Sequence, residues 1–352
     1  MKRLSFPAVV VLLLGASVAT AQTVQAPYDA SYAVSNLGSV PSLPTPYGGL
    51  DFLPSNSNVI VIGGLANNAS GALYSIGVVR GTGNHITGFT GTAALYSEGQ
   101  NNDGGVVFGP GGVLFYTRYP INQIGQIEPG SSVNDRIIDL TPLGISSSVG
   151  ALNFVPAGFP GAGGLKIASY NTGDWYTASY APDGTGTFNI TSPVLNTNIP
   201  VGPEGFVYVP PGSPIFPSGT SMLVSEYGNG VVATYQIDGG GNPIPATRAV
   251  FISGLTGAEG AVIDPVTGDF LFSTFGGGNQ VIAVSGFAVP QQETPTPTPT
   301  GVPPTATLTP TRTPTLSGAP PPPTVPTLSL PMLALLGLLL VSAAFWAITR
   351  RS

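Results

Sequence analysis

Cysteine is absent from the 352-residue sequence, and histidine occurs once, as His85. Disulfides, thiolate-ligated metals, cysteine nucleophiles and sites built from several histidines are therefore excluded. Charged residues make up only 7% of the chain, whereas 49 residues are Gly and 37 are Pro. Gly and Pro are the poorest helix formers, and a hydrophobic content of 42% is too high for general disorder. This composition favours an all-β fold with many tight turns.

The first 21 residues have the pattern of a secretory signal peptide. A basic start is followed by the apolar run Val9–Leu14 and then by Ala19 and Ala21, separated by one residue. Small residues in this spacing are typical of a signal-peptidase site, so we expect export and cleavage after Ala21. An uncleaved anchor helix is the alternative, which Pro7 and the short apolar run disfavour.

The C-terminal part divides into a stalk and a membrane segment. Residues 289–326 are rich in Thr and Pro, a composition that cannot build a core and favours a disordered, polyproline-like linker open to O-glycosylation. Leu330–Ile348 is uncharged and long enough to span a bilayer. Arg350 and Arg351 follow it, and basic residues stay on the cytoplasmic side, so the sequence predicts a C-terminal transmembrane helix within 327–352 with the rest of the chain outside.

The residues before this apolar run carry a resemblance. The motif consists of Val325, Pro326, Thr327, Leu328 and Ser329. Followed by an apolar helix and terminal arginines, it resembles the IPTL-CTERM sorting signal, a relative of the PEP-CTERM tails of bacterial envelope proteins, although the usual first residue is Ile. The resemblance implies an exosortase-type protease as partner at the bacterial membrane, removal of the tail, and delivery to the cell surface or matrix. A plain membrane anchor is the alternative.

A short motif recurs five times between residues 22 and 288. The copies begin at Gly48, Gly104, Gly150, Glu204 and Glu259 and end at Pro54, Pro110, Pro156, Pro210 and Pro265. Each copy precedes a second strand, a turn, a third strand and a fourth segment. Four short strands repeated about every 50 residues are typical of the blades of a β-propeller. A β-sandwich would show no five-fold repeat and a β-helix has shorter rungs, so we predict a five-bladed propeller, with six blades as the alternative.

The ends of the repeat region also predict how the ring closes. The fifth copy stops after its third strand, near Phe287, whereas Tyr28–Leu37 stands before the first copy without strands of its own. Placed on the last blade, this segment becomes its fourth strand and covers an exposed edge.

One part of the repeat region resembles known propellers. Leu223–Val231 and the Glu-Gly start of the last two copies are similar to blades of the NHL and SMP-30/gluconolactonase-like proteins, which usually have six blades. In the SMP-30-like enzymes a glutamate at this position holds a channel metal together with an Asn and an Asp from other blades. Asn153 and Asp51 are the candidates here, but they do not share the position of the glutamates, which leaves an enzymatic role in doubt.

The strongest candidate site is the pair Glu204 and Glu259. Both stand at the start of an innermost strand, which lies at the mouth of the central channel in a propeller, and they come from adjacent blades. Two carboxylates supplemented by carbonyls and water suit Ca²⁺. The alternative is structural, with each carboxylate accepting backbone N–H groups of the neighbouring blade.

Other residues carry weaker signals. His85 lies in a turn and is expected to be solvated rather than catalytic. Trp175, Tyr176 and Tyr180 are expected to fill space between blades, with stacking on a sugar as the alternative. No nucleophile elbow or phosphate loop occurs, so no catalytic residues or organic cofactor are predicted.

The charge balance limits the classes of partner that the protein can bind. Residues 22–288 carry 15 Asp and Glu against five Lys and Arg, a net charge of −10 that repels nucleic acid. We therefore predict a protein secreted across the inner membrane and displayed at the cell envelope as a binding or matrix module, with an envelope saccharide among the possible partners. A metal-dependent lactonase-like hydrolase and a purely structural display module are the alternatives.

Overall fold

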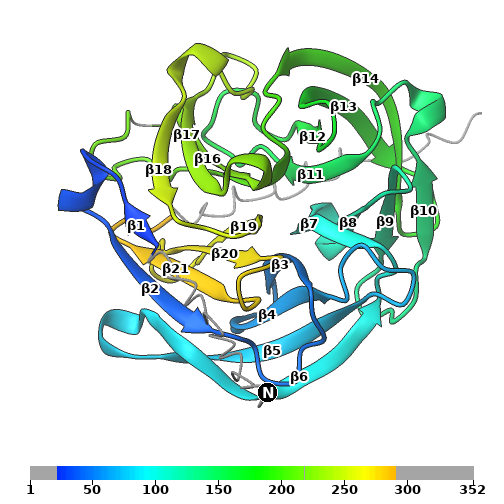
Figure 1. Ribbon diagram of the computed structural model, residues 1–352. Coiled ribbons are helices and arrows are strands. Elements are labelled where there is room, and N and C mark those ends of the chain that lie inside the picture. The colour runs from blue at the N-terminus through cyan, green and yellow to red at the C-terminus, as the bar shows by residue number, and fades with distance from the viewer. Residues whose placement is uncertain (1–21, 218, 291–352) are drawn as a thin grey trace, which may run out of the picture. The chain divides into compact units, whose positions relative to one another are not determined.

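The computed structural model describes residues 22–217 and 219–290, which form five antiparallel sheets around a central axis (Figure 1). The chain is thus an all-β, five-bladed propeller, as predicted, and the six-bladed alternative is wrong. The predicted signal peptide, the sorting motif Val325–Ser329 and the apolar run Leu330–Ile348 lie outside the described residues. Within the described part, no helix is long and apolar enough to cross a membrane.

Each blade runs from an inner strand at the axis to an outer strand at the rim. Blade 1 consists of β3 (Tyr47–Leu53), β4 (Asn56–Gly64), β5 (Ala72–Arg80) and β6 (Ile86–Glu98), and blade 2 of β7 (Asn102–Phe108), β8 (Leu114–Arg118), β9 (Gln123–Ile127) and β10 (Arg136–Asp139). Blade 3 consists of β11 (Val149–Phe154), β12 (Leu165–Ser169), β13 (Asp174–Pro182) and β14 (Phe188–Asn198), and blade 4 of β15 (Pro203–Tyr208), β16 (Ser221–Glu226), β17 (Val231–Gln236) and β18 (Ala249–Ser253). Blade 5 consists of β19 (Ala258–Ile263), β20 (Phe270–Thr274), β21 (Val281–Ser285) and β2 (Ala33–Gly38).

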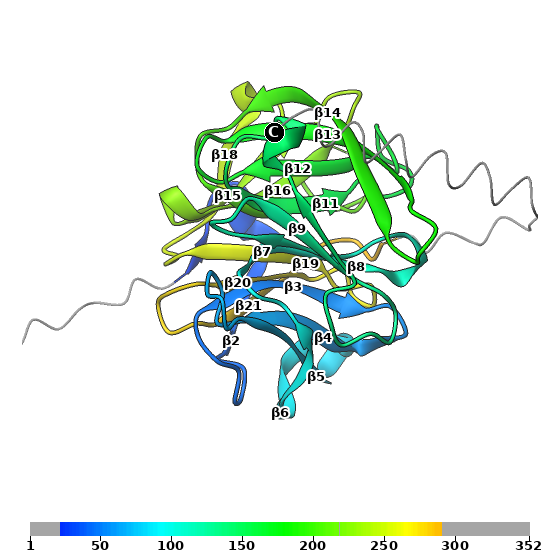
Figure 2. The ribbon, with the colours of Figure 1, turned by 90° about the vertical axis from the view of Figure 1, so that its right-hand side faces the viewer.

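Short 3₁₀ turns and tight loops connect the strands. The 3₁₀ turns are η1 (Tyr28–Ala30), η2 (Thr82–Asn84), η3 (Pro110–Gly112), η4 (Thr141–Leu143), η5 (Tyr227–Asn229) and η6 (Pro245–Thr247). In the side view of Figure 2 the outer strands β6 and β14 lie at opposite edges, and the inner strands β3, β7 and β19 lie between them.

The N-terminal segment closes the ring. β2 pairs antiparallel with β21, so the predicted fourth strand of the last blade is confirmed, although the strand begins at Ala33 because Tyr28–Ala30 is a 3₁₀ turn. A second pairing was not predicted: β1 (Thr23–Val24) pairs with β18 at the rim of blade 4. The segment therefore holds the outer edges of two neighbouring blades.

The last and first blades also meet through charged side chains. Arg80 on β5 makes a bidentate ion pair with Asp264 of blade 5, at 2.6 and 3.0 Å. His85 Nδ1 lies 2.7 Å from Asp269 Oδ2, and 46% of the histidine side chain is exposed. The histidine is thus half-exposed, as expected for a turn residue, and it contacts the neighbouring blade.

Hydrophobic clusters between adjacent blades form the core. Trp175 is fully buried, and its ring centroid lies 4.5 Å from that of Phe206 in the next blade. Tyr176 is buried as well. The expectation that these aromatic side chains fill space between blades is confirmed for Trp175 and Tyr176, which are too buried to stack on a sugar. Tyr180 is half-buried and packs against Phe154 and Phe188 of its own blade.

Five blades leave little room at the axis, and glycines at the inner strands make the close approach possible. A Cβ added to Gly49 would lie 2.3 Å from the carbonyl oxygen of Gly104 and 2.8 Å from the amide nitrogen of Val106. Both contacts are to backbone of the next inner strand, so a side chain cannot evade them by changing rotamer.

We therefore expect Gly49→Ala to lower the free energy of unfolding by about 1–3 kcal/mol, as overpacking does elsewhere. Gly88→Ala on β6 is the matched control, because a Cβ there meets nothing within 4 Å. Urea unfolding of both variants measures the difference. Equal midpoints would show that the inner strands tolerate a wider ring.

Candidate metal centre

Three carboxylates meet at the mouth of the channel where the inner strands begin. Glu204 comes from β15 and Glu259 from β19 in the adjacent blade. The structure adds Asp103 from β7, and one carboxylate oxygen of each residue lies within 4.8 Å of the other two. Asp103 and Glu259 are 0% exposed and Glu204 is 3% exposed. The sequence analysis named the two glutamates but missed Asp103.

Asp103 lies in the irregular start of β7, whose pairing with β8 shifts register between Asn102 and Val106. The other four inner strands shift register at the same place, so the position of Asp103 along the strand, and not the bulge alone, sets it apart. Asp103 stands one residue before Gly104, which holds the position of the glutamates in this blade. A strict alignment of the five motifs therefore overlooks it, and the only signal is an acidic residue directly beside a glycine of the repeat.

Glycines in the other blades provide space for Glu204. A Cβ on Gly150 would lie 2.8 Å from Oε2 of Glu204, and a Cβ on Gly104 would lie 2.7 Å from the Cβ of Glu204. Side chains at either place would displace this glutamate. In blades 2 and 3, glycine therefore occupies the repeated position, where a side chain would collide with Glu204 of blade 4.

Most oxygens of the cluster lack partners. Within the described residues, no hydrogen bond of good geometry reaches either carboxylate oxygen of Asp103 or of Glu259, or Oε2 of Glu204, although Asn67 and the Gly104 amide lie close to Asp103. Buried polar groups are nearly always satisfied, so these oxygens carry a desolvation cost that is poorly compensated. The structural alternative, in which the glutamates hold neighbouring backbone N–H groups, accounts for the Gly104 amide beside Glu204 but not for these oxygens.

Burial and mutual repulsion set the protonation of these groups. Burial raises the pKa of Asp103 from 3.8 to about 7. Burial and then the charge of Asp103 raise the pKa of Glu204 well above its usual value, and burial followed by the charges of Glu204 and Asp103 does the same for Glu259. The three carboxyls therefore titrate as one coupled group that resists full ionisation without a counter-charge.

The donor set fits a hard divalent cation. All three side chains offer oxygen, and Asn67, whose side chain lies close enough to Asp103 to lower its pKa, keeps a buried and unpartnered Oδ1. Ca²⁺ takes six to eight oxygen ligands, whereas Mg²⁺ demands a stricter octahedron and usually keeps several waters. A chain with one histidine and no cysteine offers little to softer metals.

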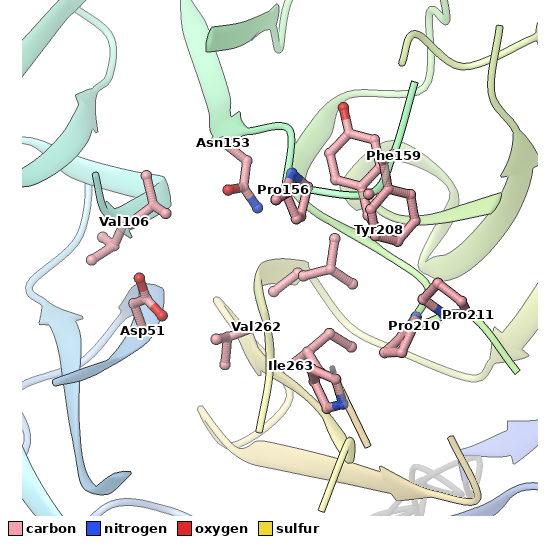
Figure 3. A pocket seen from close by; sticks show the side chains of 16 residues that line it. Asp51, Val106, Asn153, Pro156, Phe159, Tyr208, Pro210, Pro211, Val262 and Ile263 are labelled. Carbon is pink, nitrogen blue, oxygen red and sulfur yellow. The ribbon is translucent and has the colours of Figure 1, made fainter. Parts of the chain in front are cut away.

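Asp51 and Asn153 lie at the opposite mouth of the channel, where they line a pocket of about 280 Å³ (Figure 3). Oδ2 of Asp51 accepts a hydrogen bond from the Phe108 amide at 2.7 Å, and Nδ2 of Asn153 donates to the Phe206 carbonyl at 2.8 Å. Both side chains therefore link adjacent inner strands. They are not ligands of the carboxylate cluster, so the Glu, Asn and Asp set of the SMP-30-like enzymes is not reproduced by these two residues.

Comparison with known proteins gives likeness of fold alone. No family model and no curated protein matches the sequence. Among solved structures, an auxiliary nutrient binding protein from Bacteroides thetaiotaomicron is 11% identical with a TM-score of 0.41, over 72% of this chain and 76% of that chain. A putative 6-phosphogluconolactonase from Bacteroides uniformis is 12% identical with a TM-score of 0.38, over 69% and 68%. A carbohydrate-active enzyme of family AA12 from Trichoderma reesei is 8% identical with a TM-score of 0.45, over 76% and 98%.

Proposed function

We propose that the protein is a cation-binding propeller, in which Asp103, Glu204 and Glu259 hold one Ca²⁺ at the mouth of the channel. The observation that carries the proposal is the set of buried carboxylate oxygens without partners. A divalent cation satisfies these oxygens, cancels most of their mutual repulsion and ties blades 2, 4 and 5 together across the axis. The bound ion then makes the ring a rigid display or binding module.

Metal content tests this proposal directly. We expect the purified protein, after equilibration with Ca²⁺ and removal of free metal, to retain about one Ca²⁺ per chain by elemental analysis. Glu259→Gln removes a ligand charge and should abolish retention. Asp29→Asn, at an exposed carboxylate outside the cluster, is the control and should retain the ion. Equal retention by both variants would contradict the proposal.

A metal-dependent hydrolase of the lactonase type is the second candidate. It is favoured by the three carboxylates that meet at one end of the channel, where a bound divalent cation would activate water. The burial of all three carboxylates weighs against it, because a substrate must reach the metal. Lactone hydrolysis that depends on Ca²⁺ and is lost in Asp103→Asn would favour the enzyme over the binding module.

We further propose that the protein is exported across the inner membrane and sorted to the cell envelope. The support is the signal-peptide pattern ending at Ala21, the motif Val325–Ser329 and the apolar run that follows. An exosortase-type protease is the proposed partner, and the acidic propeller would face a saccharide-rich matrix, not nucleic acid.

Mass spectrometry of protein from the cell surface tests the sorting step. We expect a C-terminus near Ser329, and accumulation of Pro326→Ala in the inner membrane. An intact C-terminal Ser352 on surface-located protein would favour a plain anchor.

A further inference from the structure

A second repeated position surrounds the mouth that holds the carboxylates. The residue after the second strand is aromatic in four blades, namely Tyr119, Tyr170, Tyr227 and Phe275, and we call these four residues the aromatic crown. Each is half-buried, so part of each ring is open to solvent. Blade 1 has Leu65 at this position.

The same backbone hydrogen bond sets the position of each crown residue. Its amide donates to the carbonyl of a residue at the entry to the inner strand of its own blade. The distances are 2.9 Å for Tyr119 to Asn101, 2.8 Å for Tyr170 to Ser148, 3.0 Å for Tyr227 to Gly202 and 2.8 Å for Phe275 to Gly257. The crown is therefore built by the repeat itself.

The rings contact one another in blade order. Centroids of Tyr119 and Tyr170 are 5.5 Å apart, those of Tyr170 and Tyr227 are 5.7 Å apart, and those of Tyr227 and Phe275 are 6.0 Å apart, all with edge-to-face angles of 76–78°. A regular pentagon with sides of this length has its corners about 5 Å from its centre, which is inside the roughly 6 Å limit for a cation–π contact. A small group on the axis would thus lie about 5 Å from the centroid of each of the four rings.

The next blade holds two of the rings in place. A Cβ on Gly202 would lie 2.8 Å from Cε2 of Tyr170, and a Cβ on Gly257 would lie 3.0 Å from Cε2 of Tyr227. Both glycines have a positive φ, of 64° and 63°. Because these glycines have no side chain, each ring packs directly against the backbone of the next blade. A ring that moved outward would lose this contact.

The carboxylates lie close to the crown hydroxyls. Burial and then the charge of Glu204 raise the pKa of Tyr170 to about 12. The charges of Asp103 and Glu204 add to burial in raising the pKa of Tyr119, and those of Glu259, Glu204 and Asp103 do so for Tyr227. The carboxyl cluster thus lies near the crown. Because burial keeps it partly protonated, it adds only part of its formal charge to an acidic propeller, in which residues 22–288 carry 15 Asp and Glu against five Lys and Arg.

We propose that the aromatic crown binds an organic ammonium group, with an alkylated nitrogen on the axis among Tyr119, Tyr170, Tyr227 and Phe275. Alkylammonium ions combine a positive charge with a weakly hydrated apolar shell, which is the chemistry that aromatic cages recognise. The net negative charge of the propeller favours such a cation over a neutral saccharide. This site needs the crown but no bound metal, so it goes beyond the proposed cation-binding function.

Choline is the probe, and its neutral carbon isostere 3,3-dimethylbutan-1-ol is the matched ligand control. We expect calorimetry with the full-length protein to show choline binding at least tenfold tighter than the isostere, since the two differ in charge and hardly in shape. Equal affinities would overturn the proposal and indicate a merely apolar surface. Binding of a neutral sugar such as glucose, with no choline binding, would overturn it in favour of a saccharide site.

Variants separate the π face from the hydroxyl. Tyr170→Leu should weaken choline binding about tenfold, whereas Tyr170→Phe keeps the ring and should bind nearly as well. Tyr96→Leu, at a half-buried tyrosine on the rim of blade 1, is the matched control and should bind like the wild type. If Tyr170→Leu does not fold, Phe275→Leu replaces it, and choline binding unchanged by the loss of a crown ring would overturn the proposal.

Discussion

Deletion of residues 22–38 is expected to lower the free energy of unfolding by several kcal/mol, enough to unfold a marginal protein. The deletion removes β2 and leaves β21 as an unpaired edge in blade 5. It also removes Tyr32, which is 4% exposed, donates its hydroxyl to the Pro214 carbonyl at 2.6 Å and packs its ring 4.5 Å from that of Phe287. Loss of one buried aromatic side chain alone costs roughly 3–5 kcal/mol.

A graded deletion serves as the control. Removing only residues 22–24 takes away β1, a pairing of two residues with β18, and should cost far less. Thermal unfolding by circular dichroism compares the two deletions with the wild type. If the longer deletion melted at the wild-type temperature, β2 would be dispensable and the blades alone would hold the ring.

The metal-free protein is expected to lose stability as the pH rises from about 5 to 8. Folding raises the pKa of Asp103 to about 7 and raises the pKa values of Glu204 and Glu259 well above those of the unfolded chain. The folded state then binds more protons than the unfolded state in this range, so the free energy of unfolding falls with rising pH. One pKa unit corresponds to about 1.36 kcal/mol, so the shift of Asp103 alone is worth on the order of a few kcal/mol, and the two glutamates act in the same direction. Asp51, with a pKa raised by burial to about 7, adds to the same trend.

Calcium should reverse this dependence, because the ion binds the ionised carboxylates. At pH 8, a hundredfold excess of Ca²⁺ over its Kd stabilises the folded state by roughly 2.7 kcal/mol. Melts in EDTA and in Ca²⁺ should therefore differ for the wild type and coincide for Glu204→Gln/Glu259→Gln, whose own stability should depend less on pH. An equal response of both proteins to Ca²⁺ would defeat the metal site.

The fold could be predicted from the sequence because one motif recurs along the chain. The copy that ends at Pro54 has a counterpart in every other blade, and each copy starts an inner strand. Closure was predictable as well, since the last copy lacks a fourth strand and Tyr28–Leu37 lacks a partner of its own. The two-residue strand β1 was not, because so short a segment has no periodicity.

Two of the three carboxylates of the candidate site could be predicted from the sequence, and the third could not. Glu204 and Glu259 occupy equivalent positions, so aligning the motifs places them together. Asp103 stands one residue before the repeated position, so the same alignment overlooks it. The four crown residues occupy equivalent places in their blades, but the contacts between their rings depend on how closely neighbouring blades approach.

Ring closure also has a consequence for the timing of folding. Asn36 on β2 donates to Oε1 of Gln280, 244 residues later in the chain. β2, which is synthesised before any blade is complete, can therefore pair only after the last blade has been made. Contacts of such long range are slow to form. Four blades can assemble while the N-terminal segment is still unpaired, with an open sheet edge exposed meanwhile. The chain is most open to aggregation and proteolysis during this interval, which ends when β2 pairs with β21.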